Sequence, residues 1–227
     1  MQDDAKRRAG ERAAEFVSDG QLVGLGTGST TKFAVEKIGQ MVQSGLDIKG
    51  VPTSRATERL ALDLGIPLLD LNEVIKLDIA IDGADEVDPG FNMIKGGGGA
   101  LTREKLVALA ASKRVFVVDD TKLVEHLGQT RLLPVEVLPF AWSLSARLLV
   151  ATGCNVLLRK DGEKVFETDN GNYILDCEYG PIGDAAGLEK RIKLLPGVVE
   201  CGLFISMADT LVIAYDDRVE VKTREVD

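Results

Sequence analysis

The chain has 227 residues, of which 45% are hydrophobic and 28% charged, as in ordinary globular proteins, so long disordered stretches are excluded. Its 36 acidic and 27 basic side chains give a net charge of −9 without a long Lys/Arg run, so we expect neither nucleic acid nor an anionic membrane as a partner. Three dispersed cysteines without a CxxC pair exclude a disulfide framework and a zinc knuckle, and favour a reducing, cytoplasmic setting.

The sequence lacks long apolar segments and has a single histidine, and both features exclude whole classes of protein. The first residues, MQDDAKRRAGERAAEF, lack the apolar core of a secretory signal, and the ~18 consecutive apolar residues of a membrane span occur nowhere. His126 is the only histidine, which excludes a multi-histidine metal site and most histidine-based catalysis. We interpret His126 as an ordinary helix residue and Trp142 as an apolar or interface residue.

Apolar periodicity over the first ~120 residues predicts alternating helices and short buried strands. Helices are expected at 3–17, 30–42, 54–64 and 101–111, and strands at 21–25, 48–51, 77–81 and 115–118. Because these strands are continuous apolar runs between amphipathic helices, we predict a parallel sheet covered on both faces.

After Pro134 the order of elements changes. The pattern predicts strand, helix, two strands, helix and strand, at 135–138, 140–151, 155–159, 172–177, 184–195 and 198–205. This βαββαβ order is typical of a ferredoxin-like fold, and a last strand at 210–215 could return to the first sheet. We therefore predict an α/β protein with a Rossmann-like parallel-sheet domain, residues 1–130 plus 206–227, and an inserted α+β (ferredoxin-like) domain, residues 131–205.

The first candidate site is the segment GLGTGSTT, residues 24–31, between a predicted strand and helix. Glycines let the backbone approach a ligand, and the free N–H groups of a helix start attract an anion. The segment fits neither the dinucleotide fingerprint GxGxxG nor a Walker A motif. It indicates phosphate binding, with an ordinary capped turn as the alternative.

The second is an acidic cluster, DGADEVD at residues 82–88, directly after the apolar strand 77–81. Ligands of open α/β sheets bind at the carboxyl ends of the strands, where these carboxylates could contact sugar hydroxyls or a metal. An Asp-Gly turn that satisfies local amides is an equally good interpretation.

The third is KGGGGALTREK, residues 95–105. Four successive glycines beside Lys95 leave bare amides that could stabilise a developing oxyanion. Glu104 would lie in the first turn of the following helix, where a glutamate often only complements the helix dipole. Lys122, after the strand 115–118, and Lys6 near the N-terminus are by default surface lysines.

Together these segments supply an anion site, carboxylates, a loop of free amides and a candidate base without a redox-cofactor motif, which suits proton transfer beside the carbonyl of a phosphorylated small molecule. The segments GLGTGSTT, VPTSRAT, DGADEVD, MIKGGGGALTREK, LPVEV and TDNGN resemble, in order and over nearly the whole chain, the ribose-5-phosphate isomerase A family. The resemblance implies interconversion of ribose 5-phosphate and ribulose 5-phosphate, in the non-oxidative pentose phosphate pathway, by a homodimer without metal or organic cofactor.

The resemblance also implies residue roles. Glu104 would be the general base, and Asp82, Asp85 and Lys95 the groups that contact the sugar and open its ring. The phosphate contacts would be Thr27, Gly28, Ser29, Thr30, Lys122 and Lys6, and the further substrate contacts Gly83, Ala84, Gly96, Gly97 and Gly98. The chain departs from the family pattern at Arg131-Leu132 and in a longer segment 160–168, which puts subunit contacts in doubt more than chemistry.

Three other functions stay open at this point. A sugar-phosphate-sensing module of a transcription regulator would need a DNA-binding segment, which we do not expect ahead of Gly24. A coenzyme A transferase would use a glutamate as nucleophile and form a glutamyl thioester. Amino-sugar phosphate deamination would call for histidine chemistry, for which only His126 is available.

Overall fold

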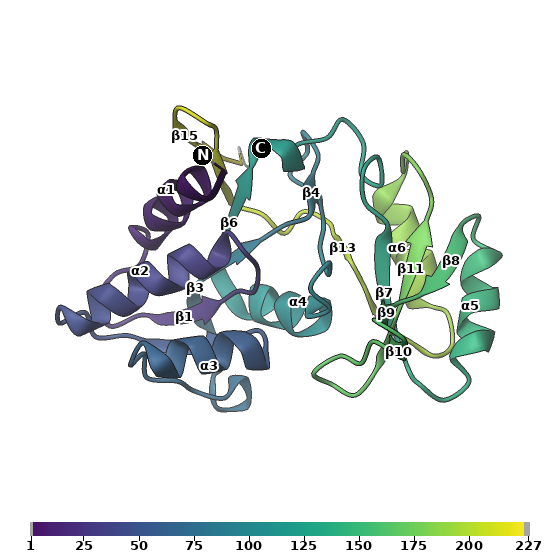
Figure 1. Cartoon of the computed structure of the whole chain (residues 1–227), viewed down its shortest axis with the longest axis horizontal. Coiled ribbons are helices and arrows are strands. Elements are labelled where there is room, and N and C mark those ends of the chain that lie inside the picture. The colour runs from purple at the N-terminus through teal and green to yellow at the C-terminus, as the bar shows by residue number, and fades with distance from the viewer. Residues whose placement is uncertain (1, 225–227) are drawn as a thin grey trace. The chain divides into compact units, whose positions relative to one another are not determined.

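The computed structural model describes residues 2–224. By its contacts the chain forms two compact units, which are described separately (Figure 1). Unit 1 consists of Met1–Ala84, Arg103–Lys122 and Met207–Asp227, and unit 2 of Asp85–Thr102 and Leu123–Ser206. The domain boundaries expected near residues 130 and 205 stay a prediction.

A six-stranded sheet forms the centre of unit 1. Its strands are β1 Leu22–Leu25, β2 Lys49–Pro52, β3 Leu77–Gly83, β6 Ala111–Asp119, β14 Thr210–Ala214 and β15 Val219–Thr223. They lie in the order β15-β14-β6-β3-β1-β2, all parallel except β15, which pairs antiparallel with β14. The predicted parallel sheet and the return of the last apolar strand are therefore confirmed, whereas β15 was not predicted.

Helices cover both faces of this sheet. They are α1 Gln2–Ala14, α2 Thr31–Gln43, α3 Arg55–Asp63 and α4 Leu101–Ala110, with short 3₁₀ turns η1 Leu71–Glu73 and η2 Asp120–Lys122. Ile79 and Ile81 of β3 pack with Ile38 of α2, whereas Ala80 between them packs with Val107 of α4. This alternation follows from the two-residue period of a strand, and it confirms the predicted cover on both faces.

The order of the strands predicts where unit 1 binds a ligand. From β1 the chain moves outward to β2 and then returns to β3 on the other side of β1. Such a switch point opens a crevice at the carboxyl ends of the two central strands. Here those ends lead directly into Gly26 after β1 and into Asp82 and Gly83 at the end of β3.

Unit 2 contains the predicted βαββαβ order. Its elements are β7 Leu133–Val137, α5 Trp142–Val150, β8 Asn155–Leu158, β11 Tyr173–Glu178, α6 Ala185–Lys193 and β12 Val198–Cys201, with a small hairpin of β9 Lys160–Asp161 and β10 Lys164–Val165. The sheet order is β12-β7-β11-β8 with antiparallel neighbours, which confirms the ferredoxin-like arrangement. Trp142 packs against the apolar core of this unit.

A second, three-stranded sheet in unit 2 was not predicted. It consists of β4 Glu86–Val87, β5 Met93–Ile94 and β13 Leu203–Phe204, in the order β13-β5-β4. The single strand expected at 198–205 is wrong, because Gly202 divides it: its N–H donates to Pro134 O, and a Cβ there would lie 2.3 Å from Lys95 O. The helix expected at His126 is also wrong, since this exposed residue lies in a bend.

Candidate functional site

Asp82 holds the loop that follows β1. Its Oδ1 atom accepts hydrogen bonds from Thr27 N (3.0 Å) and from Gly83 N (2.7 Å). A Cβ at Gly26 would lie 2.2 Å from this oxygen and 2.5 Å from Asp82 Cα, so only glycine fits there. Part of the buried Asp82 carboxylate is therefore used to shape the loop, a role that the sequence did not predict.

A cluster of hydroxyl groups holds the same loop from the other side. Thr27 Oγ1 lies 2.8 Å from Thr53 Oγ1, 2.8 Å from Ser54 Oγ and 3.0 Å from Thr57 Oγ1. Thr57 Oγ1 in turn donates to Gly26 O at 2.9 Å, and Ser54 caps α3 by accepting from Thr57 N. No role was predicted for these three partners, although a run of hydroxyls after β2, at the same edge of the sheet, could have indicated one.

The start of α2 offers free donors to an anion. Within residues 2–224, the N–H groups of Ser29, Thr30 and Thr31 have no acceptor, and Gly28 and Ser29 are exposed. A helix start with free amides is a general anion site. A cavity of about 260 Å³ borders this loop, lined by Gly26, Thr27, Gly28, Lys32, Val35, Ala56, Thr57 and Leu60. Lys32, for which the sequence pattern predicts no role, places a cation beside the loop.

The end of β6 brings further polar groups to the same edge of the sheet. Lys122 lies in η2, directly after β6, and is half-buried, as is Lys6 on α1. Asp119 is buried, and its Oδ1 accepts from the backbone and the hydroxyl of Thr121. Its Oδ2, like the buried Thr31 Oγ1, has no partner in the part of the chain that is described. Buried polar atoms are rarely left so, which marks this edge as a polar binding region.

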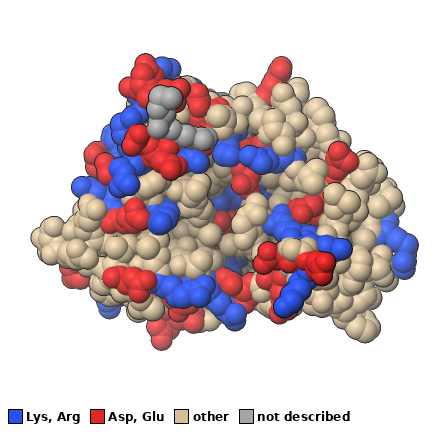
Figure 2. Space-filling model, viewed as in Figure 1, with Lys and Arg blue, Asp and Glu red and all other residues tan. Residues whose placement is uncertain are grey.

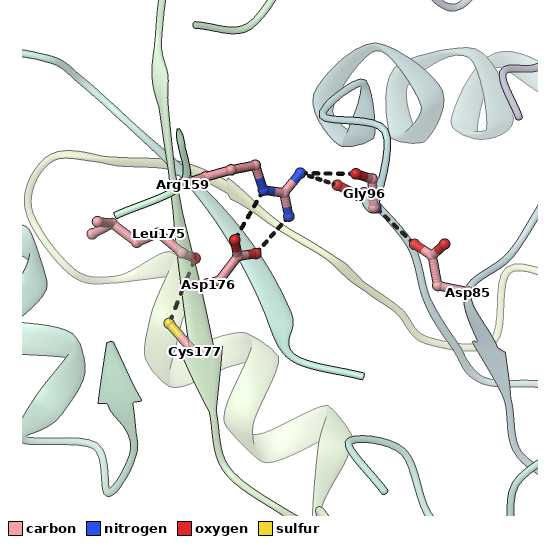
Figure 3. A network of polar contacts seen from close by, with 7 residues as sticks. Asp85, Gly96, Arg159, Leu175, Asp176 and Cys177 are labelled. Carbon is pink, nitrogen blue, oxygen red and sulfur yellow. Dashed lines mark hydrogen bonds and ion pairs between the residues drawn. The ribbon is translucent and has the colours of Figure 1, made fainter. Parts of the chain in front are cut away.

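In unit 2 the glycine segment forms a tight turn. Gly99 N donates to Gly96 O at 2.9 Å. Gly97 N donates to Asp85 Oδ2 at 2.7 Å, as Figure 3 shows. Gly96 and Gly99 have φ of +103° and +78°, which favours glycine at both positions. Gly97 and Gly98 are exposed, and the Gly98 N–H has no acceptor within residues 2–224. The amides predicted to stabilise an oxyanion are thus unequal, and Gly98 offers the exposed free donor.

Asp85 and Lys95 lie next to one another on the small sheet of unit 2. Asp85 precedes β4 and Lys95 follows β5, and the antiparallel register pairs Glu86 with Ile94. Lys95 is 2% exposed, and its Nζ lies 5.5 Å from the centre of the Phe204 ring. A carboxylate, an ammonium group and the exposed amides of the glycine turn therefore come from one small structural element.

Glu86 differs from its acidic neighbours in being fully used by the fold. Its buried carboxylate accepts from Gly128 N (2.6 Å), Thr130 N (2.6 Å), Thr130 Oγ1 (2.7 Å) and Arg131 N (2.8 Å). The acidic cluster is thus divided: Asp82 and Asp85 each hold a glycine-rich loop, whereas Glu86 organises residues 128–131.

Glu104 is the fourth residue of α4 and is only 5% exposed. Glu58 occupies the same position of α3 but is exposed, as expected for a glutamate that only complements the helix dipole. Burying a carboxylate is costly. Glu104 therefore differs from Glu58, and its burial is not what a glutamate that only complements the helix dipole would show.

Glu136 joins two segments whose role the sequence did not indicate, LPVEV and TDNGN. Its fully buried carboxylate accepts from the hydroxyls of Thr168 (2.9 Å) and Thr102 (2.5 Å), and from the side-chain amides of Asn170 (3.2 Å) and Asn172 (2.8 Å). Thr102 lies in the first turn of α4, two residues before Glu104. Glu136 thus fixes the start of the helix that carries the candidate base.

The distribution of surface charge and the possible metal ligands bear on which ligands the protein could bind. On the face in Figure 2, Lys and Arg lie among Asp and Glu and form no continuous basic patch. Within residues 2–224, Glu189, Glu200 and Cys201 bring possible metal-ligand atoms within 4.8 Å of one another. Glu200, however, pairs with Lys193 and accepts from Cys201 N. None of the helices described is long and apolar enough to cross a bilayer.

Comparison with known proteins gives a consistent result. Residues 49–218 match the family described as ribose 5-phosphate isomerase A (phosphoriboisomerase A). The ribose-5-phosphate isomerase A of Gloeobacter violaceus is 50% identical over 96% of this chain and 95% of its own length. A probable ribose-5-phosphate isomerase 2 of Arabidopsis thaliana is 48% identical, over 98% and 88%.

Solved structures agree with this result. The ribose 5-phosphate isomerase of Plasmodium falciparum has a TM-score of 0.96 at 38% identity, over 99% of this chain and 100% of that chain. The ribose 5-phosphate isomerase A of Methanocaldococcus jannaschii has a TM-score of 0.93, also at 38% identity and over 99% and 100%. These values confirm the predicted α/β fold, and the chain belongs to the ribose 5-phosphate isomerase A family.

Proposed function

We propose that this protein interconverts D-ribose 5-phosphate and D-ribulose 5-phosphate by an enediolate mechanism, as an aldose–ketose isomerase. The observation that carries the proposal is a glutamate, Glu104, buried in the first turn of α4 in a chain of this family. The same helix directly follows the glycine turn in sequence, and its first turn is held by Glu136.

The proton transfer follows from the chemistry of a carboxylate base. Glu104 removes the proton on C2 of the open-chain aldose, and the electrons of that bond form the C1–C2 double bond of the enediolate. The proton returns to C1, and the hydroxyl proton on the C2 oxygen passes to the C1 oxygen, which gives the ketose. Glu104 thus acts first as base and then as acid, which typically contributes ~10²–10⁴ in rate. The Lys95 ammonium group and the Gly98 amide would stabilise the charge that develops on oxygen.

The other predicted residues bind and prepare the substrate. Asp82 and Asp85 would contact the sugar hydroxyls and assist ring opening, in addition to accepting hydrogen bonds from the two glycine-rich loops. The free amides at the start of α2, with Lys122 and Lys6, would bind the phosphate. Because the phosphate is remote from C1 and C2, its binding energy can hold the reacting carbons in place.

A relative supports this assignment of substrate. A D-ribose-5-phosphate isomerase that is 38% identical, with a TM-score of 0.94 over 97% of this chain and 98% of that chain, was solved in complex with phospho-erythronic acid. That compound is a phosphorylated sugar acid, and its carboxylate shares negative charge between two oxygens, as an enediolate does. We propose that the present chain binds the same compound as an analogue of its intermediate.

Three broader properties belong to the proposal through the family. We propose that the protein works in the non-oxidative branch of the pentose phosphate pathway, that it forms a homodimer, and that it acts in the cytoplasm. The domain boundaries predicted from the sequence are part of the same proposal.

The test is incubation with ribose 5-phosphate in heavy water, following ribulose 5-phosphate formation and deuterium incorporation at C1. Glu104→Gln should retain substrate binding but lose ~10²–10⁴ of turnover, because the amide cannot accept the proton. Glu58→Gln is the matched control, since it removes the same charge at the same helix position of α3. Wild-type turnover in Glu104→Gln, an equal loss in Glu58→Gln, or a glutamyl thioester trapped with a coenzyme A ester would each contradict the proposed mechanism.

A further inference from the structure

Arg159 connects the glycine turn to the sheet of unit 2. This residue directly follows β8, and its Nη1 donates to Gly96 O at 2.8 Å and to Gly97 O at 3.1 Å (Figure 3). Its Nε and Nη2 donate to the two carboxylate oxygens of Asp176 on β11, at 2.9 Å and 2.5 Å. The two side chains of this ion pair are only 15% and 17% exposed, so the pair is a built-in part of the fold.

Holding these two carbonyl groups sets the direction of two amides. A peptide group is planar and trans, so its C=O and its N–H point in opposite directions. With Gly97 O held at the guanidinium group, the Gly98 N–H points away from Arg159. With Gly96 O held in the same way, the Gly97 N–H points away as well, and it donates to Asp85 Oδ2. A run of glycines has no such preference of its own, because glycine adopts many backbone conformations.

The segment 160–168 closes over the same turn. Phe166 N donates to Arg159 O at 3.0 Å across the hairpin of β9 and β10, and the Arg159 Cζ lies 5.7 Å from the centre of the Phe166 ring. A Cβ at Gly99 would lie 2.4 Å from Phe166 Cε1, so the ring packs directly on that glycine. The hairpin therefore packs an aromatic side chain against the turn that Arg159 holds.

We propose that Arg159 is a positioning residue, which aims the Gly98 amide of the glycine turn toward the substrate oxygen and the Gly97 amide toward Asp85, with Asp176 orienting its guanidinium group and Phe166 covering the turn. The inference rests on the proposed isomerase function. Lysine cannot replace arginine here, because one ammonium group cannot bind a carboxylate through two parallel bonds and also reach two carbonyl groups.

The experiment compares Arg159→Ala and Arg159→Lys with Arg114→Ala. Arg114 is the matched control, because it binds the Asp209 carboxylate through Nε and Nη2 at 2.9 Å and 2.7 Å, without contact to a glycine turn. Both Arg159 variants should lose kcat by ~10–10²-fold, somewhat less than removal of an oxyanion donor costs, with KM for ribose 5-phosphate within about threefold. Arg114→Ala should change neither kcat nor KM, even if it lowers Tm as much as the Arg159 variants do.

Two binding and exchange measurements distinguish positioning from a general loss of stability. Affinity for phospho-erythronic acid should fall with kcat in the Arg159 variants, while affinity for inorganic phosphate stays unchanged. Amide hydrogen exchange at Gly97 and Gly99, whose N–H groups are bonded within the turn, should accelerate. If Arg159→Ala does not fold, Arg159→Lys carries the test.

The outcomes separate this inference from the function on which it rests. Unchanged kcat and unchanged exchange in the Arg159 variants, with an active wild-type enzyme, would overturn the positioning role. An equal loss of kcat in Arg114→Ala would overturn it too. A wild-type protein that does not isomerise ribose 5-phosphate would instead refute the proposed function, and the exchange data would still decide whether Arg159 orders the turn.

Discussion

The two glycine-rich loops, residues 24–31 in unit 1 and 95–100 in unit 2, both present exposed amides but are held by different chemistry. The first is held by the Asp82 carboxylate and by neutral hydroxyls around Thr27. The second is held by charged groups, the Arg159 guanidinium and the Asp85 carboxylate. Glycine gives the backbone room in both, whereas side chains from distant segments determine which way the amides point.

The largest expected effect is on the first loop, when one methyl group is added to a glycine there and the result is compared with the same change in the second loop. Gly26→Ala places a Cβ 2.2 Å from Asp82 Oδ1 and 2.5 Å from its Cα, so the backbone must move. We expect a loss of about 1–3 kcal/mol of stability, as overpacking typically costs, with loss of most activity. Thermal unfolding and kcat/KM measure both effects.

Gly98→Ala is the matched variant in the second loop, since a Cβ there meets no atom within 4 Å. It should fold with an unchanged Tm and affect only turnover. A Gly98→Ala protein as unstable as Gly26→Ala would show that both loops need glycine for space, and the comparison would fail.

A smaller effect is expected when the hydroxyl cluster loses its central member. In Thr27→Val, the three partner hydroxyls keep other bonds, to Leu25 O, Gly26 O and each other, so none is left unsatisfied. Stability should therefore fall by only about 0.5–1.5 kcal/mol, while the affinity for inorganic phosphate weakens severalfold. Calorimetric titration and thermal unfolding provide the two numbers.

Thr152→Val serves as the control for that variant, because Thr152 donates to Leu149 O and bonds to Tyr179 outside both loops. It should cost similar stability without altering phosphate affinity. Unchanged phosphate affinity in Thr27→Val would mean that the first loop does not bind the phosphate.

Removal of metal ions is expected to have no effect on activity. The roles proposed for both loops rely on backbone amides and lysines where another enzyme would use a metal ion, so treatment with EDTA should leave the rate of isomerisation unchanged. Activity that is lost on chelation and restored by added Mg²⁺ would contradict the roles proposed for both loops.

Much of the fold could be predicted because its strands are unbroken apolar runs between amphipathic helices. The strand ends that carry Gly26, Asp82 and Lys122 followed from the same pattern. The two-residue strands β4, β5 and β13 are too short to show a period. Strand β15 is largely exposed and lacks a buried face to predict it.

Side-chain contacts between distant segments were the part that could not be predicted. Arg159 lies more than 60 residues from the carbonyl groups that it holds, and a hydrogen bond of that kind leaves no local pattern. The helix expected around His126 failed for a related reason. Glu86 accepts from the N–H groups of Gly128, Thr130 and Arg131, and Gly128 adopts a φ of +80° that ends any helical path.

Glu136 has a consequence for how this chain can change in evolution. One carboxylate satisfies donors from the start of α4 and from the TDNGN segment, so replacing it leaves the buried Thr168 hydroxyl and several half-buried donors without this acceptor at once. Substitutions at Thr102, Glu136 and Thr168 should therefore be strongly non-additive. A lineage could exchange this trio only by passing through intermediates less stable than either end.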